Sequence, residues 1–382
     1  MDMTPHFPIY MDYGATTPVD QRVVDAMIPW LREHFGNPAS RSHAWGWEAE
    51  AAVEKAREQV AALVGADPRE IVWTSGASES DNLALKGIAQ LHGDGHFVTS
   101  AIEHKAILDS CEWLETQGFE VTYLPPQADG TTSPAAVAAA LRPDTRLVSI
   151  MHVNNELGCI NDIAAIGAVC KEAGVLFHTD AAQGFGKLPI DVRAMSIDML
   201  SISGHKIYGP KGVGALFVRR EPPIGLKAQI HGGGHERGMR SGTLPTHQIV
   251  GIGEAAELMA SQGEAERERL TALRGRLLRR ILQLPEVTVN GSENDGWPGI
   301  ANLGFGGVDG ETLMLALDDL ALSTGSACNS ESVEPSYVLE ALKVPRAIAH
   351  ASLRFSLGRF STEAEVEHAG ARVVEVVERL RG

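Results

Sequence analysis

The chain has 382 residues, a formal net charge of −16 and a hydrophobic content of 44%. This composition excludes a disordered chain, and the acidic balance argues against a protein that binds nucleic acid or an anionic membrane surface. No run approaches the roughly 18 consecutive apolar residues of a membrane span, and the first residues lack the basic and apolar segments of a secretion signal. We therefore expect a cytoplasmic globular protein with no nucleic-acid or membrane partner.

Short apolar runs alternate with helical patterns in the first two thirds of the chain, residues 17–255. This alternation predicts βαβ units and a mostly parallel sheet, whose strands are apolar throughout because both faces are buried. The expected elements are, in chain order, a strand at 71–73, a helix from 79, a strand at 96–99, a helix from 104, a strand at 146–150, a helix at 163–173, and strands at 174–178, 198–202 and 214–218.

The pattern changes after residue 255. A long, highly charged helix is predicted at 254–284, and Pro285 ends it. Short strands follow at 287–289 and 300–303, and a last helix is predicted at 363–380. These elements indicate a smaller α/β domain that the long helix connects to the first one.

The four cysteines show no spacing typical of a zinc site or a disulfide framework. Cys111 and Cys170 lie in helical patterns, where an inert buried thiol is expected, and Cys159 follows a glycine in a structural loop. Cys328 differs, because residues 323–330 around it are all small or polar, as is typical of a mobile, exposed loop.

Common phosphate and metal motifs are missing from the sequence. Residues 204–211 do not have the spacing of a phosphate-binding P-loop. The glycines at 251–256 follow no predicted strand, whereas a dinucleotide-binding fingerprint directly follows one. His231 and His235 are four residues apart, but three glycines between them argue against a helical metal pair. We therefore expect no intrinsic metal.

Three other segments place polar residues where predicted strands end. The strand that begins near Val175 ends in the carboxylate of Asp180, and in α/β sheets the carboxyl ends of strands face the ligand crevice. Lys206 lies between a strand and a glycine-rich turn, and residues 71–80 form a strand, a small-residue turn and a helix start that offers N–H groups to a phosphate. Taken alone, such an Asp is more often a helix cap and such a Lys is more often solvated.

Together these three segments suit pyridoxal phosphate. The lysine can form a Schiff base with the cofactor aldehyde, which requires a fixed and partly desolvated amine. The aspartate can keep the ring nitrogen protonated, and the helix start can bind the phosphate.

Longer motifs occur at 10–18, 35–40, 103–105, 152–156, 203–206, 231–243 and 353–360. They resemble, in order and nearly from end to end, those of cysteine desulfurases of the IscS/NifS type in the class V aminotransferase family. The resemblance implies a type I fold of pyridoxal-phosphate-dependent transferases, with a large, mostly parallel sheet of the seven-stranded type and a smaller C-terminal α/β domain. It implies an N-terminal arm at 1–16 that packs on the small domain, a large cofactor-binding domain at 17–255 and a small domain at 256–382 that carries the Cys328 loop.

The resemblance also implies the reaction and its partners. L-cysteine would become L-alanine while Cys328 receives the sulfur as a persulfide, for iron–sulfur cluster assembly, tRNA thiolation or both. The partners would be a second copy of the chain in a homodimer and sulfur-acceptor proteins, and Cys328 could transiently ligate an iron–sulfur cluster.

The roles that the resemblance assigns divide into a cofactor set and a substrate set. Lys206 matches the Schiff-base lysine, Asp180 the partner of the ring nitrogen, His104 the imidazole stacked on the ring, and Gln183 the donor to the phenolic oxygen. Asn155 and Arg354 match the residues that bind the substrate carboxylate, Asn155 also contacting the cofactor. The phosphate site would comprise Ala77, Ser78, Ser203 and His205, with Thr243 from the second subunit.

The sequence departs from the family pattern at three places. Ser78 stands where threonine is usual, and Glu331 follows Cys328 where a small uncharged residue is expected. If Glu331 comes close, its charge should raise the pKa of the thiol. The chain ends at Gly382, whereas housekeeping members carry a further tail that helps dock the iron–sulfur scaffold, so the resemblance does not extend to that docking.

Two alternatives stay open at this point. A selenocysteine lyase or another β-eliminating lyase of the same family would share the cofactor residues, and the Cys328 loop favours the desulfurase. A catalytically silent sulfur-transfer platform is a second alternative, which the presence of Lys206, Asp180 and His104 disfavours.

Overall fold

The computed structural model describes residues 7–324 and 335–382. Its largest sheet has seven strands in the order β2-β8-β7-β6-β5-β3-β4. Among the described strands of this sheet only β8 runs antiparallel to its neighbours, so the predicted mostly parallel sheet is confirmed. The strands are β2 (Ile71–Thr74), β3 (His96–Ser100), β4 (Glu120–Leu124), β5 (Thr145–Ser149), β6 (Leu176–Asp180), β7 (Met199–Ser203) and β8 (Gly214–Val218).

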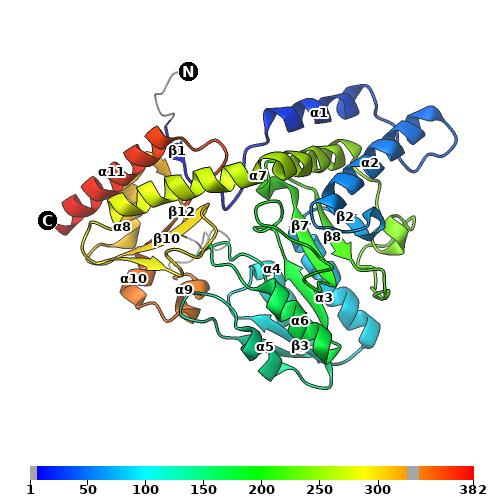
Figure 1. The fold of residues 1–382 in the computed structure, drawn as a ribbon, viewed down its shortest axis with the longest axis horizontal. Helices are drawn as coiled ribbons and strands as arrows, with labels where there is room; N and C mark the ends of the chain where they lie inside the picture. The colour runs from blue at the N-terminus through cyan, green and yellow to red at the C-terminus, as the bar shows by residue number, and fades with distance from the viewer. Residues whose placement is uncertain (1–6, 325–334) are drawn as a thin grey trace.

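Helices cover both faces of this sheet (Figure 1). Successive strand residues divide between two buried clusters, since Ile71 and Trp73 belong to one and Val72 to the other. This division explains why β2 and β8 show continuous apolar runs. The helices of this part are α1 (Gln21–Arg32), α2 (Ala44–Ala62), α3 (Ala77–His92), α4 (Lys105–Thr116), α5 (Pro134–Ala140) and α6 (Ile163–Ala173), with a short 3₁₀ turn η1 (Pro68–Glu70).

A second, smaller layer of strands lies at the other end of the molecule (Figure 1). Its antiparallel sheet has the order β12-β10-β9, and β1 pairs in parallel with β11. Ile9 and Met11 of the N-terminal segment belong to the buried cluster of this layer. The elements are β1 (Ile9–Tyr10), β9 (Val287–Asn290), β10 (Ile300–Phe305), β11 (Leu320–Ala321), β12 (Ser352–Ser356), α8 (Gly310–Ala316), α9 (Tyr337–Ala341), α10 (Arg346–His350) and α11 (Glu363–Arg381).

One long helix, α7 (Thr246–Ile281), joins the two layers. Its first half contributes Ile252 and its neighbours to the cluster of the large sheet, and its second half contributes Leu273 and its neighbours to the cluster of the small one. The residue 255/256 boundary expected from the sequence lies inside this helix. No helix in the described ranges is long and apolar enough to cross a membrane.

The predicted start of this helix at residue 254 is wrong by eight residues. The glycine-rich segment before it weakens a helical pattern because glycine has a low helix propensity. In the structure the glycines allow close packing, since a Cβ atom on Gly253 would lie 2.8 Å from the Cα of Ala56 in α2, and one on Gly251 would lie 2.7 Å from the sulfur of Met27 in α1.

Candidate active site

A cavity of about 630 Å³ opens at the carboxyl edge of the parallel strands. Strands β2, β6 and β7 end at this edge because they run in the same direction, and the small layer closes the opposite side. The cavity brings together ten of the residues predicted from the sequence, namely Ala77, Ser78, His104, Asn155, Asp180, Gln183, Ser203, His205, Lys206 and Arg354.

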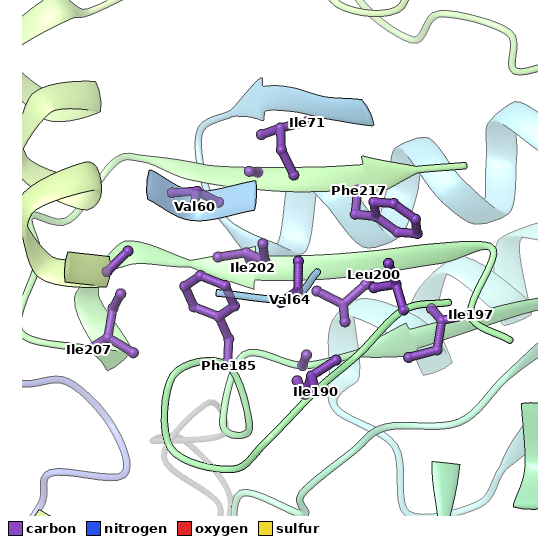
Figure 2. Packing of buried hydrophobic residues seen from close by; sticks show 14 of the residues in the cluster. Val60, Val64, Ile71, Phe185, Ile190, Ile197, Leu200, Ile202, Ile207 and Phe217 are labelled. Carbon is purple, nitrogen blue, oxygen red and sulfur yellow. The ribbon is translucent and has the colours of Figure 1, made fainter. Parts of the chain in front are cut away.

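Two buried side chains anchor the segments that carry the central residues. Phe185 follows Asp180 and Gln183, and Ile207 follows Lys206. Figure 2 shows Phe185 and Ile207 entering the buried cluster beside Ile202 of β7. The hydrophobic core therefore holds the two turns that present Lys206 and Gln183 to the cavity.

Lys206 ends the 3₁₀ turn η2 (Gly204–Lys206), which follows β7 directly. Its Nζ donates hydrogen bonds to the backbone carbonyls of Gly14 and Ala15, at 2.7 Å each. The N-terminal segment thus holds the amine at the cavity wall through backbone atoms.

Asp180 and His104 are the two titratable side chains at the centre of the cavity, and each alters the pKa of the other. Burial raises the pKa of Asp180, and His104 and Lys206 oppose this rise. Burial lowers the pKa of His104, Lys206 lowers it further, and Asp180 acts in the opposite direction. His104 is consequently neutral at neutral pH.

The tautomer of His104 follows from its place at the start of α4. As the N-cap residue, it accepts a hydrogen bond at Nδ1 from the backbone N–H of Ala106, 3.1 Å away. A ring nitrogen that accepts carries no proton, so the proton of the neutral ring is on Nε2.

The start of α3 is suited to an anion. Its N-cap residue is Gly76, and no described side chain caps the helix end, so backbone N–H groups at Ala77 and Ser78 are left for a ligand. His205 lies nearby, its Nδ1 3.1 Å from the hydroxyl of Thr16, and burial together with Lys206 lowers its pKa to about 4.

Arg354 enters the cavity from β12 in the small layer and is 2% exposed. Its Nη1 donates to the backbone carbonyl of Asn155 at 2.8 Å, and its Nη2 donates to Oδ1 of Asp12 at 2.7 Å. The Oδ1 atom of Asn155 is buried and accepts no hydrogen bond from any described residue. The guanidinium of Arg354 can therefore bind a carboxylate, and Oδ1 of Asn155 can accept a hydrogen bond from a donor group of a ligand.

Gln183 lies between the N-terminal segment and a second lysine. Its Nε2 donates to the carbonyl of Gly14 at 2.7 Å, and its Oε1 accepts from Nζ of Lys187 at 2.8 Å. The carbonyl of Gly14 thus accepts from both Gln183 and Lys206.

Two of the predicted site residues are not placed in the cavity. Thr243 is exposed and lies outside the cavity lining, while its loop is joined to α3 by the ion pair of Arg240 and Glu79, 2.8 Å apart. Cys328 and Glu331 lie outside the described residues.

The other cysteines are not available as nucleophiles. Cys111, Cys159 and Cys170 are all buried, as expected from the sequence. Burial raises the pKa of each thiol, to about 12 for Cys159 and Cys170, and further for Cys111. A protonated, buried thiol is a poor nucleophile.

Sequence reasoning missed two buried carboxyl groups at the cavity. Glu156 lines the cavity and accepts a hydrogen bond from the hydroxyl of Ser336. Glu103 lies behind the cavity lining and accepts a hydrogen bond from the N–H of Met151, a lining residue, at 2.7 Å. Both carboxyl groups have raised pKa values because they are buried. Their positions inside the motifs 103–105 and 152–156 were the available signal.

The described residues fit pyridoxal phosphate. A primary amine on Lys206, a buried carboxyl on Asp180 and an uncapped helix start at Gly76 surround one cavity of suitable volume. The unpartnered Oδ1 of Asn155 supports this conclusion, because a buried acceptor without a partner is costly unless a ligand supplies the donor.

Comparisons with known proteins agree with this geometry. A family model described as Aminotransferase class-V matches residues 9–368. The chain is 60% identical to a protein named Cysteine desulfurase IscS from Ectopseudomonas mendocina, over 98% of this chain and 94% of the relative. The fold of this chain is similar to that of a solved NifS-like protein, with a TM-score of 0.90 and 35% identity over 97% of this chain and 99% of the other. A structure titled SspA in complex with cysteine gives a TM-score of 0.84 and 44% identity over 92% and 99%.

Proposed function

This chain belongs to the class V aminotransferase family, and from relatives of 58% and 60% identity that are named Cysteine desulfurase IscS we infer that it is a pyridoxal-phosphate-dependent cysteine desulfurase. The fold is that of the type I pyridoxal-phosphate-dependent enzymes. The observation that carries the inference is the cavity itself, in which ten residues from distant parts of the chain converge. Relatives that share more than half of this sequence carry the same desulfurase name, which disfavours a selenocysteine lyase.

The proposed reaction transfers one sulfur atom. The thiolate of Cys328 attacks the sulfur of a bound L-cysteine, so that an S–S bond forms as the C–S bond breaks. The substrate carbon keeps the electron pair of the broken bond and takes up a proton, which yields L-alanine. The sulfur remains on Cys328 as a persulfide, and no external oxidant or reductant is needed.

We propose that the cofactor is held by the residues that converge in the cavity. When bound, pyridoxal phosphate supplies an electron sink next to the substrate carbon. Lys206 would attach the cofactor and move a proton at the substrate α-carbon, while the Asp180 carboxylate would hold a proton on the ring nitrogen. His104, neutral and protonated on Nε2, can donate that proton beside the ring and take it back afterwards.

The substrate carboxylate would bind to Arg354 and Asn155. The guanidinium already donates to Asp12 and to the backbone of Asn155, so its plane is fixed before the substrate arrives. A fixed fork reduces the entropy lost on binding and keeps the substrate sulfur in one place.

We also propose the sulfur acceptors, the location, the assembly and the domain division of the protein. The sulfur acceptors would be an iron–sulfur scaffold, a tRNA-thiolation carrier or both, and Cys328 could ligate a cluster transiently. The protein would act in the cytoplasm as a homodimer, with Thr243 of each subunit completing the phosphate site of the other. We also propose the division into an arm at 1–16, a large domain at 17–255 and a small domain at 256–382, with the arm packed on the small domain.

The test of the proposed function is reconstitution of the purified protein with pyridoxal phosphate and L-cysteine. We expect alanine and reducible sulfur in equal amounts in the presence of a thiol reductant. Lys206→Ala should abolish both the absorption band of the attached cofactor and alanine production, while Lys171→Ala, a change at an exposed position on α6, should leave both intact. Full activity of Lys206→Ala would contradict the proposal, and a higher rate with L-selenocysteine than with L-cysteine would favour the lyase.

A further inference from the structure

A second lysine lies behind Lys206, and the roles described so far do not use it. Lys187 follows β6 in the turn that also carries Gln183, and its backbone N–H donates to the carbonyl of Gly184 at 3.0 Å. The residue as a whole is half-buried, but its amino group is directed inward to the buried amide of Gln183. Lys187 also lines an interior space of about 10 Å³ that it shares with Lys206, which is at most the size of one water molecule.

The charged groups around Lys187 are largely engaged with one another. Glu266 accepts from the hydroxyl of Tyr208 at 2.6 Å and from Nε of Arg359 at 2.8 Å. The Nζ of Lys187 lies 5.8 Å from the ring centre of Trp297, within the range of a cation–π contact. Burial and, to a smaller extent, the charge of Lys206 lower the pKa of Lys187 to about 7, although Glu266 acts in the opposite direction.

The two hydrogen bonds of Gln183 set the orientation of its amide. A lysine ammonium can only donate and a backbone carbonyl can only accept, so Oε1 faces Lys187 and the NH₂ group faces Gly14. An amide NH₂ group has two N–H bonds, and the bond to Gly14 uses one of them. Since Gln183 lines the cavity, the other is available to a ligand there.

We propose that Lys187 is a positioning residue that holds and polarises the amide of Gln183, so that its second N–H is presented to an acceptor oxygen in the cavity. The proposal rests on the proposed function, in which that acceptor is the phenolic oxygen of the cofactor. A cationic donor on Oε1 withdraws electron density from the amide and makes its N–H a stronger donor. Lys187 thus acts on the cofactor through Gln183 and does not touch it.

The experiment is a double-mutant cycle on the cofactor-loaded protein, with Lys187→Met and Gln183→Leu. The readout is the pH midpoint at which the absorption of the bound cofactor changes, measured without substrate. A weaker donor to the phenolic oxygen leaves more electron density on the cofactor, so Lys187→Met should raise the midpoint. The shift should be smaller than the roughly one pH unit that a whole hydrogen bond is worth, because Gln183 itself remains. In the Gln183→Leu background the same substitution should cause no shift.

The cycle separates this role from a direct effect of charge. An equal shift in both backgrounds would mean that the charge of Lys187 acts on the cofactor directly, and no shift in either background would mean that it has no role there; both results overturn the proposal. Lys171→Met is the matched control for a lysine-to-methionine change and should not move the midpoint.

A second measurement does not depend on the stability of a variant. In the unmodified protein, the side-chain amide signal of Gln183 in an ¹⁵N nuclear magnetic resonance spectrum, assigned by its loss in Gln183→Leu, should shift with a midpoint near pH 7. An amide signal that is constant from pH 5 to pH 11, a range that spans both the lowered and the ordinary pKa of a lysine, would overturn the proposal. Alanine production by the unmodified protein tests the proposed function separately, so the two can fail independently.

Discussion

Arg354 and Asp12 form an ion pair across 342 residues of sequence, with Nη2 of the arginine 2.7 Å from Oδ1 of the aspartate. The pair joins β12 of the small layer to the N-terminal segment that also supplies the acceptors of Lys206. The side chain proposed to bind the substrate carboxylate is therefore oriented by the same segment that holds the amine of Lys206.

Asp12→Asn should raise the KM for L-cysteine about tenfold, which corresponds to about 1.4 kcal/mol, with a smaller effect on kcat. The amide keeps the size of the side chain but removes the charge that orients the guanidinium. Steady-state alanine formation over a range of cysteine concentrations measures the effect. Asp25→Asn on the exposed side of α1 is the control, and an unchanged KM in Asp12→Asn would show that the pair does not orient Arg354.

Cys328→Ser should abolish persulfide formation and steady-state alanine production without preventing cysteine from binding. A serine hydroxyl stays protonated at neutral pH and is a far poorer nucleophile toward sulfur than a thiolate. The change in cofactor absorption on adding cysteine should therefore persist while turnover is lost.

The buried cysteines provide the matched controls for this variant. Cys111→Ala, Cys159→Ala and Cys170→Ala should keep turnover and lower only the thermal midpoint, because each removes a buried side chain. Retained turnover in Cys328→Ser with loss in one of these three would overturn the assignment of the nucleophile. Retained turnover in all four would indicate direct elimination, as in a lyase.

A mixture of two inactive variants should recover activity if each site uses residues of two subunits. Thr243→Glu places a carboxylate where the proposed contact to the cofactor phosphate is made, and Lys206→Ala removes the catalytic amine. In a mixed dimer, one site combines an intact Lys206 with an intact Thr243 from the other subunit, so random exchange should restore about a quarter of the unmodified activity.

The alternative gives a different outcome. If Thr243 acts within its own subunit, every site in the mixed dimer carries one defect and the mixture stays inactive. Sedimentation provides the accompanying measurement, since a stable, fully active monomer would contradict the shared site altogether.

Because His178 is buried, the folding stability of the protein should depend on pH. This dependence can be measured as the difference between the unmodified protein and a His178 variant. His178 is fully buried, with Nδ1 2.8 Å from the hydroxyl of Ser149 and Nε2 2.9 Å from that of Ser201, and burial lowers its pKa to about 3. Between pH 6.5 and pH 3 the unfolded chain protonates this ring while the folded chain does not, so folding stability falls as the pH falls.

His178→Gln removes this contribution. The free energy of unfolding of the unmodified protein, minus that of the variant, should decrease by about 1.4 kcal/mol per pH unit as the pH falls from 6 to 4. Taking the difference cancels the opposite contribution of the buried carboxyl groups of Glu103 and Asp180, whose pKa values burial raises. A difference that does not change with pH would show that His178 is protonated in the folded protein.

The fold of the large layer could be predicted because its signal is local. A strand buried on both faces tends to form a continuous apolar run, and the sequence shows such runs for β2 at residues 71–73 and for β8 at Gly214–Val218. The edge of the sheet at which the cavity opens could be predicted from the same local signal, because parallel strands end at one edge and Asp180 ends β6. The short helices α9 and α10 were not predicted because five residues contain too little periodicity.

The supporting contacts of the site could not be predicted from the sequence. Asp12 and Gly14 lie far from Arg354 and Lys206 in sequence, and their roles come from tertiary pairing alone. Lys187 looks like an ordinary surface lysine in the sequence, because its inward direction is set by the turn after β6 and by Trp297 from the small layer.

The acceptors that hold Lys206 belong to the main chain at Gly14 and Ala15, and so no amino-acid replacement can delete them. Alanine scanning would record Ala15 as silent, and a larger residue at Gly14 would mainly report crowding, since its Cβ would lie 3.2 Å from Oγ of Ser356. Their contribution becomes measurable only by altering the peptide linkage itself. An ester in place of the amide that follows Gly14 would weaken the Gly14 carbonyl as an acceptor and leave every side chain unchanged. It would also remove the N–H that Ala15 donates to the carbonyl of Asp12, 3.0 Å away. This part of the site is therefore accessible to chemical synthesis more than to genetics.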